Sequence, residues 1–78
     1  MSNTPHQLAE EFPEHVSTMQ RLKQEDAHFA RLCEEYHEVN KAIHLAETNL
    51  EPTDDFHMED MRKQRMRLKD EIYALLAA

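Results

Sequence analysis

A 3-4 spacing of apolar residues constrains this chain more than any other feature. Apolar positions step by three and four without a break from residue 29 to residue 50. The spacing returns between residues 58 and 75, with Arg65 at one of its positions. This heptad pattern predicts two helices that each bury one narrow stripe, as in a coiled coil. Pro52 lies between them and excludes a helical conformation for the residue before it. The sequence therefore predicts an all-α fold built on an antiparallel two-helix hairpin.

A single register aligns the two patterns. In an antiparallel hairpin, facing residues have a nearly constant sum of residue numbers, and Val39 with Leu68 gives the same sum as Leu32 with Leu75. A short loop is compatible with this register. The predicted seam between the helices consists of Phe29, Leu32, Tyr36, Val39, Ile43, Ala46, Leu50, Met58, Met61, Leu68, Ile72 and Leu75.

The remaining boundaries follow from prolines and capping residues. Pro13 suits the first turn of a helix, where its missing N–H costs little. Asp26 can cap the long helix, and a break there explains why the upstream apolar residues fall out of phase. We expect a disordered arm over 1–11 and one domain over 12–78, with a short helix at about 13–24, a long helix at about 27–50, a turn at 51–54 and a last helix at about 55–76.

Composition limits the class of protein. The chain has 78 residues, no glycine, one cysteine and a formal net charge of −7. A lone thiol, Cys33, favours a reducing cytoplasm over a secreted scaffold. The first residues do not resemble a signal peptide, and the longest apolar run is far shorter than the roughly 20 residues of a membrane span. We expect a cytoplasmic protein without a membrane span, and net acidity disfavours nucleic acid as the main partner.

The basic stretch RKQRMRLKDE, residues 62–71, is expected to serve charge matching inside the chain. The hairpin register places two polar pairs beside the seam, Glu47 with Arg62 and Asn40 with Lys69. Glu59 precedes Lys63 by four residues, which is the favourable order on a helix. These cations divide between two faces, so they do not form one stripe for a phosphate backbone.

Several short segments carry a resemblance to a known family. They are FPEH at 12–15, LK at 22–23, DAHF at 26–29, EYHEVNKAI at 35–43 and RKQRMRLKDEI at 62–72. In this order and spacing they resemble the YdcH-like family of small uncharacterised bacterial proteins. Members commonly have Asn-Pro where this chain has Asp26-Ala27. The resemblance implies a cytoplasmic helical hairpin, and it supplies no activity and no catalytic residues.

Metal binding and catalysis find little support in the sequence. Cys33 and His37 are four residues apart, with His28 and His44 on the same predicted helix, but structural zinc usually needs four converging ligands. Two packed helices offer no concave pocket to shift a pKa. We therefore expect no metal, no cofactor, no small-molecule substrate and no enzyme activity.

Apolar residues outside the seam suggest an association surface. They are Phe12, Val16, Met19, Met66, Tyr73 and Leu76. One interpretation is that the first helix folds back onto the apolar C-terminal end, giving a three-helix monomer. The other is self-association into a helical bundle or docking on another protein. We expect association, because an isolated helix pair of this size is marginally stable.

Two classes of function follow. The leading hypothesis is a protein–protein interaction or adaptor module that forms a homodimer or binds a partner helix. The alternative is a regulator of transcription or other nucleic-acid machinery, acting through the basic stretch 62–69 or through an acidic tip. That tip would be formed by Glu51, Asp54 and Asp55, where the two long helices meet.

Overall fold

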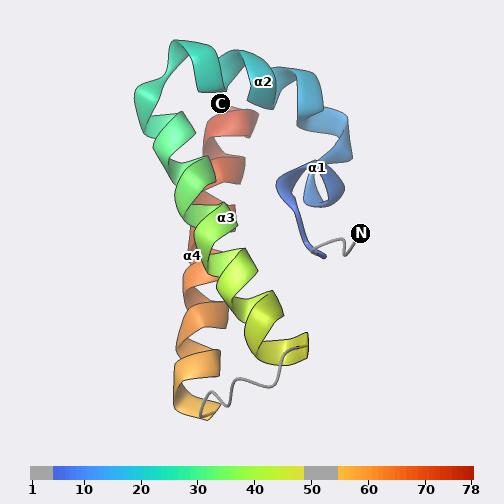
Figure 1. Cartoon of the computed structure of the whole chain (residues 1–78). Helices are drawn as coiled ribbons and strands as arrows, with labels where there is room; N and C mark the ends of the chain where they lie inside the picture. Colours follow the sequence, from blue (N-terminus) through green and yellow to red (C-terminus); the bar gives the residue numbers. More distant parts are fainter. Residues whose placement is uncertain (1–4, 49–54) are drawn as a thin grey trace.

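The computed structural model describes residues 5–48 and 55–78, and all the regular elements in these ranges are helical. The long helices α3 and α4 lie side by side and run in opposite directions (Figure 1). The predicted all-α hairpin preceded by a short helix is therefore confirmed. The elements in chain order are α1 (Leu8–Glu11), the 3₁₀ turn η1 (Pro13–His15), α2 (Val16–Glu25), α3 (Ala27–Thr48) and α4 (Asp55–Ala77).

Asp26 separates α2 from α3 as the sequence predicted. Its carboxylate Oδ1 accepts the backbone N–H of His28 at 3.0 Å and that of Phe29 at 3.3 Å. Such an N-cap is worth about 1 kcal/mol of helix stability. The backbone of Asp26 is extended, with φ −129° and ψ 107°. This one residue turns the chain, so that α2 lies across one end of the hairpin (Figure 1).

The seam is the buried centre of the hairpin. Phe29, Tyr36, Ile43 and Ile72 are each 0 % exposed. Fully burying an apolar side chain of this size contributes about 1.5–3 kcal/mol, so these positions dominate the packing of α3 on α4. The other predicted seam residues within the described ranges are buried or half-buried. Leu50 and the predicted turn at 51–54 lie outside the described residues.

The expectation of a disordered arm is wrong for its last part. Residues Leu8–Glu11 form α1, and Leu8 is only 3 % exposed. The helical turn is short, and the backbone N–H of Phe12 closes it by donating to the carbonyl of Leu8 at 2.8 Å. The sequence signal of one leucine among polar residues was too weak to predict this docking. Before α1, His6 adopts a left-handed conformation with φ 62°, which costs about 1–2 kcal/mol for a residue other than glycine.

The N-terminal helices fold back onto the hairpin. The main core cluster joins all of them and consists of Leu8, Phe12, Met19, Phe29, Leu32, Cys33, Tyr36, Ile72 and Leu76. Phe12, Met19 and Leu76 were predicted to form an association surface, and this is corrected: they are buried within one chain. The physical reason is that the apolar end of α4 provides the cover that α1 and α2 need. The structure thus adopts the predicted fold-back, with the additional helix α1 packed beside α2 and the hairpin.

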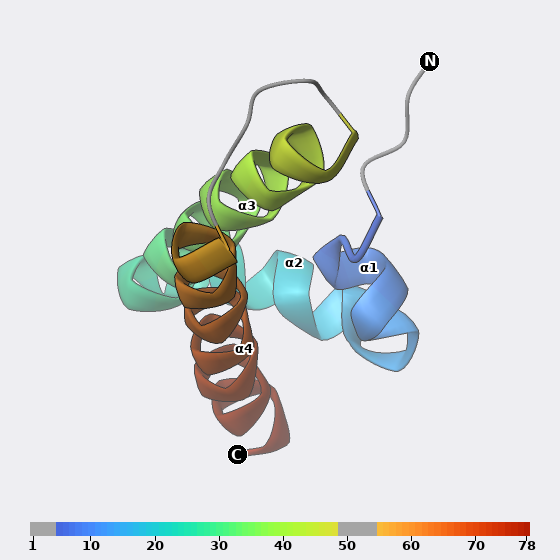
Figure 2. The same cartoon turned by 90° about the horizontal axis from the view of Figure 1, so that it is seen from below.

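This fold-back gives the hairpin two unlike sides. Figure 2 shows α1 and α2 on one side of the α3–α4 pair, with no element on the other side among the described residues. We call the side beneath α1 and α2 the covered flank and the opposite side the bare flank.

Candidate functional site

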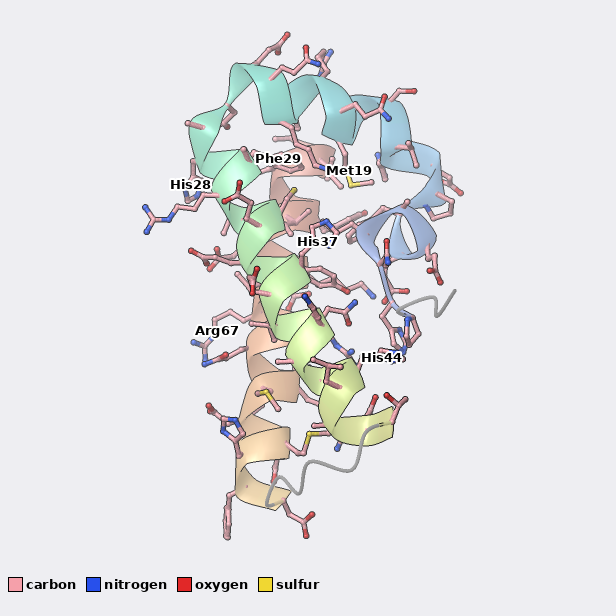
Figure 3. All side chains as sticks on the ribbon, viewed as in Figure 1. Met19, His28, Phe29, His37, His44 and Arg67 are labelled. Atoms are coloured by element: carbon pink, nitrogen blue, oxygen red, sulfur yellow. The ribbon has the colours of Figure 1, made fainter. Side chains whose placement is uncertain are left out.

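The bare flank carries an open groove of about 910 Å³ between α3 and α4. Val39 and Leu68 lie in it half-buried, while the charged residues around them are exposed. In Figure 3, Arg67 extends from α4 to the side away from α1. The lining residues are Arg31, Glu34, Glu35, His37, Glu38, Val39, Gln64, Arg67, Leu68 and Glu71.

Acidic side chains predominate around this groove. Four glutamates line it against two arginines. Arg31 pairs with Glu35 one turn later on the same helix, at 3.5 Å between Nε and Oε1. Glu35 and Glu71 come from opposite helices and both line the groove. The groove is therefore an apolar strip with a net negative rim.

The covered flank holds a buried polar network that reaches the N-terminal segment. The amide Nδ2 of Asn40 donates to the carbonyl of Pro5 at 2.8 Å, and the hydroxyl of Tyr36 donates to the carbonyl of His6 at 2.6 Å. Arg65 Nη1 donates to Asn40 Oδ1 at 2.9 Å, which fixes the orientation of the amide. Asn40 is 2 % exposed and Tyr36 is 0 % exposed. The two α3 side chains therefore hold the backbone of residues 5 and 6.

Two further side chains of α4 hold the residues that follow. Lys69 Nζ donates to Glu11 Oε1 at 2.9 Å, and the same ammonium lies 5.8 Å from the centre of the Phe12 ring. The Phe12 ring stacks on Tyr73 with 5.8 Å between centroids and 20° between planes. Together the backbone and side-chain contacts define one surface, which we call the clamp: Tyr36, Asn40, Arg65, Lys69 and Tyr73.

Docking and burial shift the pKa of three groups on the covered flank. The hydrogen bond from Lys69 lowers the pKa of Glu11, and His6 acts in the same direction, with its Nδ1 3.6 Å from the carboxylate. Burial raises the pKa of the Tyr36 phenol, and the negative charge of Glu11 adds to that effect. Burial also raises the pKa of the Cys33 thiol, which keeps it protonated and unreactive. The shifts therefore arise from burial and from the hydrogen bond between Lys69 and Glu11.

The two predicted flanking pairs have different outcomes. Glu47 and Arg62 form the expected ion pair at 3.0 Å. Asn40 and Lys69, predicted to face each other beside the seam, do not bond to each other: Lys69 bonds to the Glu11 carboxylate of α1, and Asn40 bonds to Pro5 and Arg65. Both side chains therefore bond to residues other than each other.

The other predicted site residues do not form one common surface among the described residues. Of the proposed association surface, Val16 is half-buried, whereas Met66 and Tyr73 are 61 % and 51 % exposed. Asp55 is exposed at the start of α4, and Glu51 and Asp54 lie outside the described residues. Within residues 5–48 and 55–78, no group of three or more His, Cys, Asp or Glu side chains is arranged to hold a metal ion.

Sequence reasoning did not find the clamp, although a signal for it exists. Tyr36 and Asn40 are four residues apart, and one occupies a seam position while the other flanks it. A buried tyrosine hydroxyl needs a hydrogen-bond partner, and the apolar residues of α4 opposite it provide none. These polar groups therefore indicated a third segment over the hairpin.

Comparison with known proteins adds one match. Residues 29–76, more than half of the chain, match the model of a family described as "Protein of unknown function (DUF465)". No curated protein and no solved structure shows significant similarity. Among the helices in the described part of the chain, none has the length and apolar character needed to cross a membrane.

Proposed function

Because this chain belongs to the DUF465 family, whose function is unknown, we propose a role from its own surfaces: a non-enzymatic interaction module that binds an amphipathic helix of a partner protein. The groove on the bare flank is the observation that carries the proposal. It leaves Val39 and Leu68 accessible between charged rims, whereas the chain's own helices cover the other flank. A helix in a groove is a common mode of peptide recognition.

Charge indicates what kind of helix fits. The glutamates outnumber the arginines around the groove, so a partner helix with basic residues beside its apolar stripe complements the rim. A second copy of this chain fits this flank less well, because each copy brings the same acidic rim and the chain carries a net charge of −7. The proposal therefore favours a different protein over a homodimer at this surface.

The alternative role at nucleic-acid machinery has weaker support. Four of the five cations between residues 62 and 69 bond to the chain itself: Arg62, Lys63, Arg65 and Lys69. Such pairing leaves few free cations for phosphate contacts, which dominate nucleic-acid affinity. The narrower YdcH-like assignment and the cytoplasmic location remain part of the proposal, supported by the motifs and by the single thiol.

The test uses two defined peptides and an isotope-labelled full chain. Both peptides form the same amphipathic helix with a leucine stripe, one flanked by lysine and the other by glutamate. We expect the lysine peptide to bind at least tenfold more tightly, with NMR shift changes centred on Val39, Gln64 and Leu68. The variant E38K/E71K should reverse the preference between the two peptides.

A matched control separates the groove from net charge. The variant E14K/D70K changes the total charge by the same amount at exposed residues outside the groove. It should keep the preference for the lysine peptide. Equal binding of both peptides, or shift changes away from the groove, would refute the proposal.

A further inference from the structure

We propose that the clamp on the covered flank is a second binding site, which recognises a partner peptide with an acidic residue followed by an aromatic one. Residues 5–12 of this chain occupy the site as an internal ligand. The inference goes beyond the proposed function, because it concerns the opposite side of the hairpin and a different peptide class. The groove and the clamp are tested with different peptides, so a negative result for one proposal leaves the other standing.

The backbone contacts have the character of peptide recognition. Asn40 and Tyr36 donate to two successive main-chain carbonyls, those of Pro5 and His6. Main-chain carbonyls are present in any peptide, so these bonds supply affinity without requiring a particular sequence. Arg65 holds the Asn40 amide by its oxygen, which leaves the Nδ2 hydrogens free to donate. The contact that orients the Asn40 donor thus lies within the hairpin, between α4 and α3.

The side-chain contacts supply selectivity. Lys69 bonds the Glu11 carboxylate and lies beside the ring of the next residue, Phe12. Tyr73 provides the stacking surface for that ring and is still 51 % exposed. A peptide that presents a carboxylate and then an aromatic ring repeats both contacts. A peptide with a lysine in place of the glutamate would face Lys69 with a like charge.

The occupying segment is short and lies outside the part of the chain that matches the family. Its regular structure is the single helical turn α1, Leu8–Glu11, and His6 has the left-handed φ of 62°. All five clamp residues lie within the residues that match the family, 29–76, whereas the segment precedes them. The receptor surface is therefore part of the family hairpin, and its occupant is attached from outside.

The experiment supplies the segment in trans to the full chain. The probe is a synthetic peptide of residues 5–14, PHQLAEEFPE, and its partner probe carries lysine at the Glu11 position. In the wild-type chain the attached segment competes at high effective concentration, so binding should be weak. The variant Glu11→Lys weakens the attached segment, and we expect it to bind the PHQLAEEFPE peptide at least tenfold more tightly than wild type.

A charge exchange gives the specificity test. The variant Lys69→Glu should prefer the lysine-containing peptide, whereas Lys41→Glu, the same charge change at an exposed residue outside the clamp and the groove, should behave as wild type. Circular dichroism verifies that each variant is folded, and Glu11→Gln serves as a milder replacement if Glu11→Lys unfolds. Binding of both peptides within twofold of each other to the folded variants would overturn the proposal. A wild-type dimer that Lys69→Glu abolishes would also overturn it, because the site would then belong to a second copy.

Discussion

The covered and bare flanks of the hairpin both carry ion pairs, but the paired residues are far apart in the sequence on one flank and close together on the other. On the covered flank, Lys69 bonds to Glu11, a residue 58 positions away in the sequence. On the bare flank, Arg31 bonds to Glu35 one turn along its own helix. A pair between distant segments fixes tertiary structure, whereas a pair within one helix supports only that helix. The difference separates residues that hold the fold from residues available to a partner.

The largest expected difference between the flanks is in apolar packing. Phe12→Ala removes a ring that is 9 % exposed in the core, and we expect a loss of about 3 kcal/mol or more of unfolding free energy. Leu45 lies seven residues after Glu38 on α3 and is 45 % exposed, so Leu45→Ala should cost less than about 0.5 kcal/mol. Urea unfolding followed by circular dichroism measures both. Similar losses would mean that the bare flank is buried in solution.

Asn40→Ala should have the next largest effect. The change leaves the Pro5 carbonyl without its donor and the Arg65 guanidinium without its acceptor, at a cost of about 1–3 kcal/mol. Glu38→Ala, two residues earlier on the bare flank, should change stability by less than about 0.5 kcal/mol. Amide exchange at Leu8 to Phe12 should accelerate in Asn40→Ala alone. Unchanged exchange there would show that the amide does not hold the segment.

Acid should weaken the covered flank through Glu11. The folded-state pKa of this carboxyl lies below its usual 4.5, chiefly because Lys69 donates to it. Its stabilising contribution is therefore complete above the unfolded-state pKa and is lost as pH falls through the folded-state pKa. The stability difference between wild type and Glu11→Gln should be largest near pH 7 and should shrink below about pH 4.5. A difference that stays constant across this range would exclude the Glu11 charge as its source.

The smallest effects are expected from the exposed ion pairs. Glu47 and Arg62 lie 3.0 Å apart but are half-exposed, and a double-mutant cycle should give about 0.2–1 kcal/mol. The Arg31–Glu35 pair on the bare flank should give no more than about 0.5 kcal/mol. Both coupling energies should decrease as salt is added. A larger value for Arg31–Glu35 would indicate that the bare flank is shielded from solvent.

The hairpin and its interruptions were predictable from sequence because their signals are local or periodic. Spacing placed Tyr36, Ile43 and Ile72 in the seam, and the short polar side chain of Asp26 predicted the cap. The register also predicted the Glu47–Arg62 pair, because a hairpin repeats its geometry along its length.

The clamp was not predictable in the same way. Tyr36 and Asn40 indicate that some segment covers them, but their acceptors are the main-chain carbonyls of Pro5 and His6, which the residue types at 5 and 6 do not identify. Glu11 is one of many glutamates, and nothing in its spacing selects it as the partner of Lys69. Leu8 is a single apolar residue among polar neighbours, so it belongs to no periodic pattern that would predict its burial. Such contacts depend on where the chain folds back, and the sequence pattern does not encode that direction.

The buried thiol of Cys33 can report how often the covered flank opens. Its side chain is 2 % exposed, within the core cluster that includes residues of α1 and α2. An alkylating reagent can reach the sulfur only during intervals when the covering helices lift from α3. The rate of modification at rising reagent concentration would therefore report how often this flank opens and how quickly it closes. A peptide that competes for the clamp should change the rate of Cys33 modification without unfolding the hairpin.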